Sequence, residues 1–94
     1  MDNTRLILLC EDYNNTDLFI TNLDNWQLQI VLERAIENDE NGIGKSAEEI
    51  AEEQFRDEYY IKQLATSEDH IELKDLECKC IANYSYYSFC EIKQ

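Results

Sequence analysis

The sequence contains no proline and only two glycines among its 94 residues. Because these residue types interrupt helices and strands, most of the chain is expected to lie in regular secondary structure. The sequence also lacks a long apolar run, and the apolar run near its start covers only residues 6–10. That run is too short for the core of a signal peptide or for a membrane-spanning helix. We therefore expect a cytoplasmic protein whose cysteines are reduced.

Basic residues are also scarce, since eight lysines and arginines face 21 aspartates and glutamates, for a net charge of −13. Nucleic acids and anionic membranes are bound through cationic side chains, so this charge argues against both as direct partners. It favours a basic protein as the partner. The alternative is that the acidity only keeps a small protein in solution.

Chemistry-bearing motifs are missing as well. The only histidine is His70, and no nucleophile with a neighbouring base can be identified along the chain. No cofactor-binding loop is present either, so the sequence predicts a protein that is not an enzyme and needs no cofactor.

The apolar residues that are present predict a single α+β domain over residues 1–94. Short apolar or alternating segments indicate strands, and apolar residues three and four apart indicate helices. The expected architecture is a small two-layer domain, in which an antiparallel sheet carries two helices on one face in the order β-β-α-α-β-β. The expected elements are strands 6–10 and 18–21, helices 23–38 and 46–65, and strands 76–82 and 84–92.

Both helix starts carry capping residues. Thr21 or Asn22 is expected to cap the first helix, and Ser46 with Glu49 forms a capping box at the second. One apolar face of the first helix is clear, and it comprises Leu28, Val31, Leu32, Ala35 and Ile36. In the second helix, Gln54 and Glu58 fall inside the apolar face, which a simple amphipathic helix would not favour.

Trp26 and Ile30 fall on the polar face of the first helix. Exposed tryptophan is a frequent anchor of protein interfaces, so both residues are candidates for partner binding. The alternative is that the first helix is sandwiched between the sheet and the second helix.

Acidic residues concentrate in the segment 37–58, which holds nine acids and two bases. Regularly spaced carboxylates can imitate a nucleic-acid backbone and occupy the basic groove of a nuclease or repressor. This pattern predicts a binding protein that inhibits a nucleic-acid-binding enzyme, such as an anti-CRISPR or anti-restriction protein of a phage or mobile element. An immunity protein or antitoxin against a basic toxin would use the same physics. The candidate partner-binding acids are Asp39, Glu40, Glu48, Glu49, Glu52, Glu53 and Asp57.

The same segment resembles the calcium-binding loop of EF-hand proteins, with Gly42 at the sixth loop position. The resemblance covers twelve residues and departs from the pattern at Glu37, where aspartate is usual. It implies an alternative function, a calcium-binding helix-loop-helix domain. The metal ligands would be Glu37, Asp39, Asn41 and Glu48.

Two of the four cysteines, Cys78 and Cys80, stand two residues apart in an alternating strand pattern. Zinc sites usually contain Cys-x-x-Cys pairs, which this chain lacks. Reduced cysteine behaves as a small apolar residue, so both are expected to point from the strand into the core.

Overall fold

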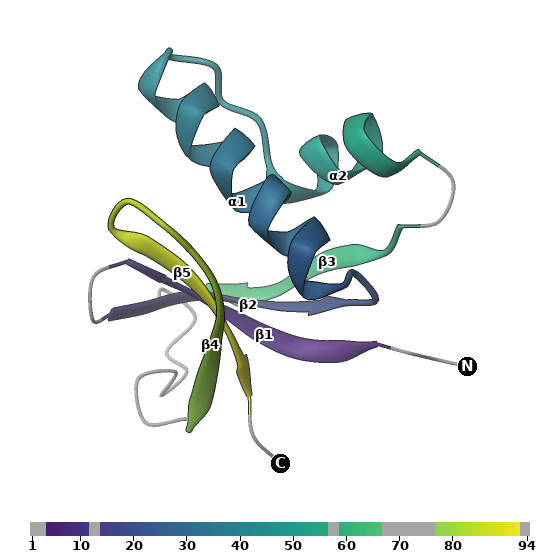
Figure 1. Cartoon of the computed structure of the whole chain (residues 1–94), viewed down its shortest axis with the longest axis vertical. Helices are drawn as coiled ribbons and strands as arrows, with labels where there is room; N and C mark the ends of the chain where they lie inside the picture. The colour runs from purple at the N-terminus through teal and green to yellow at the C-terminus, as the bar shows by residue number, and fades with distance from the viewer. Residues whose placement is uncertain (1–3, 12–13, 57–58, 67–76, 93–94) are drawn as a thin grey trace.

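The computed structural model of the chain describes residues 4–11, 14–56, 59–66 and 77–92. Two strands come first, two helices follow, and three strands complete the chain (Figure 1). The elements are β1 (Arg5–Glu11), β2 (Asn14–Thr21), α1 (Asn25–Glu40), α2 (Ala47–Phe55), β3 (Ile61–Thr66), β4 (Cys78–Tyr84) and β5 (Tyr87–Ile92).

The strands form one antiparallel sheet with the order β3-β2-β1-β5-β4. The first and last strands along the chain, β1 and β5, are therefore neighbours, with Leu8 opposite Cys90. Both helices lie on the same face of this sheet (Figure 1). The predicted two-layer α+β class is confirmed.

The predicted length of the second helix is wrong. Instead of continuing to residue 65, α2 ends at Phe55 and the chain forms the additional strand β3. Arg56 follows the helix at a φ of 46°, which turns the chain out of the helical path. An uninterrupted helix would have buried Gln54 beside apolar residues, whereas Gln54 is exposed here. Strand β3 then begins at Ile61, directly after two further β-favouring residues, Tyr59 and Tyr60.

The beginning of α1 also differs from the prediction, because Asp24 is the N-cap rather than Thr21 or Asn22. The backbone N–H of Asp24 donates to Oε1 of Gln27 at 2.8 Å. Thr21, the last residue of β2, instead bonds to the segments that precede α1 and β3: its hydroxyl donates to the carbonyl of Tyr60 at 2.8 Å and accepts from the N–H of Leu23 at 3.0 Å. This fully buried threonine holds the start of α1 against the residues that lead into β3.

The first two strands extend farther than their apolar runs indicated, whereas β4 and β5 begin later than the predicted strands 76–82 and 84–92. The first hairpin extends its pairing from Arg5–Thr21 to Glu11–Asn14, so the polar residues expected in the loop are mostly strand. At the other hairpin, Ser85 adopts a φ of 58° between β4 and β5, as two-residue turns of primed type require. Between the predicted helix 46–65 and the predicted strand 76–82, the residues beyond Thr66 lie outside the described part of the chain.

The main core lies between the helices and the sheet. The predicted apolar face of α1 is confirmed, since Leu28, Val31, Leu32 and Ile36 are buried. Ile50 and Ala51 of α2 complete the helical side. On the sheet side, Phe19 and Phe89 meet edge to face, with ring centroids 6.0 Å apart.

The cysteines are only partly in core positions. Cys10 and Cys90 are buried with their sulfur atoms 3.7 Å apart, while Cys78 is half-buried. Cys80, which was expected to point into the core, is exposed. The pairing of β4 with β5 shifts its register between Cys80 and Ala82, which interrupts the alternation on which the prediction relied. Burial raises the pKa of the Cys10 and Cys90 thiols, so both remain protonated and unreactive near neutral pH.

Candidate protein-binding surface

Helix α2 begins at the capping box that the sequence predicted. The Ser46 hydroxyl accepts from the backbone N–H of Glu49 at 3.2 Å, and Glu49 Oε1 accepts from the backbone N–H of Ser46 at 3.4 Å. These bonds satisfy two of the donors that every helix start leaves unpaired. They fix the direction in which the helix presents its side chains.

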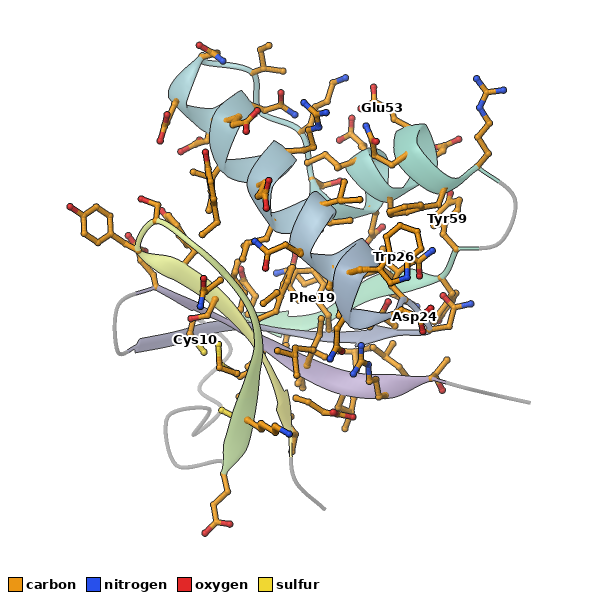
Figure 2. The ribbon with its side chains drawn as sticks, in the orientation of Figure 1. Cys10, Phe19, Asp24, Trp26, Glu53 and Tyr59 are labelled. Carbon is orange, nitrogen blue, oxygen red and sulfur yellow. The ribbon has the colours of Figure 1, made fainter. Side chains whose placement is uncertain are left out.

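The two sides of α2 differ sharply in polarity. Ile50 and Ala51 are 1% and 0% exposed and belong to the main core. The opposite side faces solvent, and Figure 2 shows Glu53 pointing away from the sheet. We call this side the acidic helix face; it consists of Glu48, Glu49, Glu52 and Glu53.

Three of the four acids on this face make structural hydrogen bonds. Glu49 closes the capping box, and Glu53 pairs with Lys45 of the preceding loop. Glu48 Oε1 accepts from the backbone N–H of Gln63 at 3.1 Å, which joins α2 to the edge strand β3. Among the described residues, Glu52 is the acid of this face that makes no side-chain hydrogen bond or ion pair.

Asp39 and Glu40 are exposed in the last turn of α1. A helix C-terminus carries a partial negative charge, and α1 has no basic residue in its last turn to offset these carboxylates. Acids at this position disfavour the helix, in contrast to Glu48 and Glu49 in the first turn of α2. Their placement is therefore not explained by helix stability.

The acidic residues near the end of α1 change the pKa of Tyr84, which lies at the end of β4. Glu37 is the main cause that raises the pKa of the Tyr84 phenol above its ordinary value of 10.0, with smaller contributions from desolvation, Glu40 and Glu33. The carboxylates at the C-terminal half of α1 therefore act together on one neighbouring group.

Trp26 lies at the junction of the two helices. Its indole meets the Phe55 ring edge to face, with centroids 6.0 Å apart, yet the side chain remains 61% exposed. Figure 2 shows Trp26 at the start of α1, on the side where α2 ends. Ile30, one turn later, is half-buried. The sequence did not link Trp26 to Phe55, because their contact depends on the angle between two helices.

The structure does not bring the expected calcium ligands together. Among the described residues, which include Glu37, Asp39 and Glu48, no three acidic, histidine or cysteine side chains are grouped as a metal site requires. The Glu48 carboxylate accepts a hydrogen bond from Gln63 of β3. The Glu37 carboxylate forms an ion pair with Arg34, with 3.7 Å between Oε2 and the guanidinium nitrogen. Asn41 donates through Nδ2 to the carbonyl of Glu37 at 2.9 Å. Asp57, expected on the partner-binding surface, lies outside the described residues.

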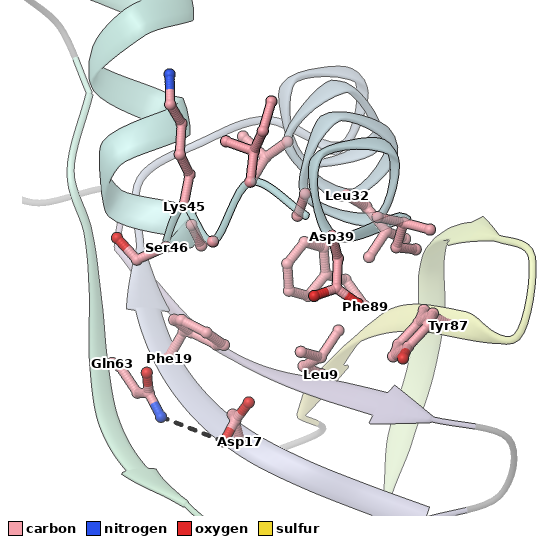
Figure 3. Close-up of a pocket in the computed structure, with 16 residues that line it drawn as sticks. Leu9, Asp17, Phe19, Leu32, Asp39, Lys45, Ser46, Gln63, Tyr87 and Phe89 are labelled. Carbon is pink, nitrogen blue, oxygen red and sulfur yellow. Dashed lines mark hydrogen bonds between the residues drawn. The ribbon is translucent and has the colours of Figure 1, made fainter. Parts of the chain in front are cut away.

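A cavity of about 270 Å³ opens between α1, the loop that leads to α2, and the sheet (Figure 3). Its inner walls are buried apolar side chains, among them Phe19, Leu32 and Phe89. Its polar lining residues are at least partly exposed, and they include Asp17 and Asp39. No local pattern in the sequence indicates this cavity, because its walls come from four strands and both helices.

Comparisons with known proteins do not place the chain in a family: no protein-family model matches it, and no curated protein or solved structure matches it significantly. Among the described residues, no helix has the length and apolar character needed to cross a membrane.

Proposed function

We propose that this chain is a non-enzymatic binding protein that inhibits a partner by occupying its basic, nucleic-acid-binding surface. The observation that supports this function best is the acidic helix face, four exposed glutamates on a helix whose other side is fixed in the core. A rigid array of carboxylates presents its charges at constant spacing, and it attracts a basic surface rapidly at low salt.

Asp39 and Glu40 strengthen the proposal. Acids that disfavour the helix in which they lie contribute nothing to folding, and a role in binding gives a reason for their position. Together with Glu52, they form the set of exposed acids without a hydrogen bond or ion pair among the described residues of this region. Their charges are therefore fully available to a partner.

Trp26 supplies the apolar part of such an interface. A large aromatic side chain that is exposed but held in place by Phe55 loses little conformational freedom on binding. Arginine side chains stack on indole rings, so an arginine-rich partner can use both the ring and the neighbouring carboxylates. Ile30 is the second apolar candidate on α1.

In its concrete form, the proposal describes a phage or mobile-element protein that blocks a restriction or CRISPR nuclease. An immunity protein or antitoxin that covers a basic toxin differs only in its target. The genes that neighbour this one distinguish the two, since a toxin gene beside it supports the second form.

The proposal is tested by capture of partners on the immobilised chain, followed by elution with duplex DNA at low salt. A partner held through its nucleic-acid groove is released by DNA and by raised salt. The charge variant combines D39K, E40K and E52K, because these acids carry no hydrogen bond whose loss would disturb the fold. It should lose the partner, and Trp26→Ala should weaken retention separately.

The matched control is Glu77→Lys, which reverses one exposed acid just before β4, the strand at the opposite edge of the sheet from β3 and α2. It should retain the partner as the unchanged protein does. Retention that persists at high salt, resists DNA, or survives the triple reversal would refute the proposal.

A further inference from the structure

The four cysteines of the chain form a cluster of their own, far apart from one another in sequence but close in the fold. They lie in three consecutive strands of the sheet: Cys10 in β1, Cys90 in β5, and Cys78 with Cys80 in β4. Cys10, Cys90 and Cys78 pack in a second apolar cluster, which is separate from the main core between the helices and the sheet. Figure 2 shows sulfur atoms gathered near Cys10, away from both helices. We call the four cysteines the thiol cluster, and it is distinct from the acidic helix face.

Cys80 is the member of the thiol cluster that solvent reaches most easily. Its side chain is exposed, whereas Cys78 is half-buried and both Cys10 and Cys90 are buried. An oxidant reacts with a thiolate, and it must also be able to reach the sulfur atom. Burial raises the pKa of the Cys10 and Cys90 thiols, so neither is the first point of attack. Oxidation of the cluster therefore starts at Cys80.

The register of β4 and β5 places Cys80 directly opposite Cys90. The pairing stays regular on that side, where Lys79 is opposite Glu91, and the bulge begins only after Cys80. Directly opposed residues in antiparallel strands have Cα atoms about 4.5–5.5 Å apart and side chains on the same face of the sheet. A disulfide spans Cα separations of about 4.4–6.8 Å, so Cys80 and Cys90 can be joined within the existing register.

Cys90 also contacts the thiol of Cys10, but the backbone there is less suited to a bond. The two sulfur atoms are 3.7 Å apart. The register of β1 and β5, however, pairs Leu8 with Cys90 and Cys10 with Ser88, so the two cysteines are diagonal neighbours. Diagonal neighbours lie about 7–8 Å apart, and a Cα separation above about 7 Å cannot be bridged without movement of the backbone. The register therefore favours Cys80 over Cys10 as the partner of Cys90.

We propose that Cys80 and Cys90 are a site of reversible oxidation, at which a hydroperoxide converts the two thiols into a cross-strand disulfide. In the first step the Cys80 sulfur attacks the hydroperoxide, the O–O bond breaks, and Cys80 becomes a sulfenic acid while water or an alcohol leaves with the Cys80 proton. In the second step the Cys90 sulfur attacks that of Cys80. The S–O bond breaks, the S–S bond forms, and the hydroxyl group leaves with the Cys90 proton as water.

The two thiols are thus oxidised by two electrons, and the hydroperoxide is reduced. Cys90 needs no contact with solvent, because it reacts only with the sulfur that Cys80 presents across the ladder. The disulfide would lie at the exposed strand β4, where a dithiol reductant can attack it and restore both thiols. Such a transient bond is compatible with a reducing compartment. This site is independent of the partner-binding function proposed above.

The test is oxidation of the reduced chain with an equimolar amount of hydrogen peroxide, followed by alkylation of the remaining thiols with N-ethylmaleimide and mass spectrometry of the fragments. Trypsin alone leaves Cys80 and Cys90 in one fragment, because no lysine or arginine lies between Lys79 and Lys93. Chymotrypsin cuts at the aromatic residues between the two cysteines, and trypsin separates Cys78 from Cys80. The bond should join Cys80 to Cys90, and dithiothreitol should remove it.

Three variants separate the roles of the thiols. Cys80→Ser changes an exposed side chain, so the chain should remain folded, and it should abolish oxidation of Cys90 by peroxide. Cys90→Ala should stop the reaction at the sulfenic acid of Cys80, which dimedone traps. Cys10→Ala is the matched control, since it removes the thiol that contacts Cys90 and should still allow the Cys80–Cys90 bond to form.

Several outcomes would overturn the proposal. They are a chain that peroxide leaves fully reduced, a bond that joins Cys10 to Cys90 or Cys78 to Cys80, and loss of the bond in Cys10→Ala while that variant remains folded. Cys80→Ser should still capture the protein partner, because its side chain lies far from the acids of α2 in the strand order of the sheet. The oxidation site and the partner-binding function therefore fail separately.

Discussion

The two helices each carry four acidic residues, but they contribute to the molecule in different ways. Helix α1 has 16 residues, buries four of them and packs across the sheet toward β4 and β5. Helix α2 has nine residues, buries two and packs beside β3 at the sheet edge. The comparison teaches that equal acidity goes with unequal burial, because α1 is held on the sheet by more buried residues than α2.

The acids are also distributed differently along the two helices, although Glu52 and Glu53 of α2 lie near its C-terminal end. In α1 they lie in the C-terminal half and oppose the helix dipole, whereas Glu48 and Glu49 occupy the first turn of α2 and are favoured by it. The long helix tolerates this cost because its buried face holds it on the sheet. The short helix depends on its capping box and on bonds from its own glutamates.

Leu28→Ala should have the largest effect, because Leu28 is fully buried on the core side of α1. Removing this side chain should lower the free energy of unfolding by about 3 kcal/mol, from lost apolar burial and the cavity left behind. Urea denaturation followed by circular dichroism measures it. The control Arg34→Ala changes the exposed side of α1 and should cost no more than about 0.5 kcal/mol. Similar losses for both variants would contradict the structural role of α1.

Thr21→Val should have the next largest effect. Valine keeps the shape of the threonine side chain but loses its bonds to Tyr60 and Leu23, and it leaves a buried donor unpaired. The free energy of unfolding should fall by about 2 kcal/mol. Thr21→Ser, which retains the hydroxyl, should lose less. The reverse order would show that the methyl group, and not the link from α1 to β3, matters at this position.

Ser46→Ala should cost about 1 kcal/mol, because it removes the capping bond at the start of α2. Since α2 has only nine residues, hydrogen exchange should accelerate in α2 well before α1 is affected. Ser46→Asp, which retains a capping oxygen, should restore slow exchange. Equal acceleration in both helices would show that they unfold as one unit and would remove the contrast between them.

These contrasts bear on what the sequence could predict. The strands 6–10 and 18–21 and the apolar face of α1 follow from local periodicity, which the structure confirms. The end of α2 does not, because residues 54–65 contain apolar positions compatible with helix or strand. The one local sign against a longer helix was the polar Gln54 within the predicted apolar face. The strand β3 that follows is stabilised by pairing with β2, and a local sequence pattern does not reveal such long-range pairing.

The candidate surface was predicted in a similar, partial way. The exposure of Glu48, Glu49, Glu52 and Glu53 follows from their helical spacing, as the structure confirms. Spacing could not show that Glu48 bonds to β3 or that Trp26 packs on Phe55, because both contacts depend on how α2 is placed in three dimensions. The cavity between α1, the loop before α2 and the sheet depends on the same placement.

Glu40→Gln should raise the free energy of unfolding by about 0.5 kcal/mol, because it removes a negative charge from the negative end of α1. The matched variant Glu48→Gln removes the same charge from the first turn of α2 and should lower the free energy by a similar amount. Both effects should shrink at high salt. Changes of the same sign would show that net charge, rather than position along each helix, decides the cost of these acids.

The smallest effect should be on Tyr84, whose phenol pKa is raised mainly by Glu37. Glu37→Gln should move this pKa down toward 10.0, and Glu52→Gln should leave it unchanged, as followed by NMR of ¹³C-labelled tyrosine. A phenol whose pKa is raised on folding stabilises the protein fully below pH 10, and this contribution is lost as the pH rises through the folded-state value. Glu37→Gln should therefore reduce the loss of stability above pH 10. An equal shift from Glu52→Gln would mean that the pKa of Tyr84 depends on the total charge of the molecule. The acids of α1 and α2 would then not differ in their effect on this phenol.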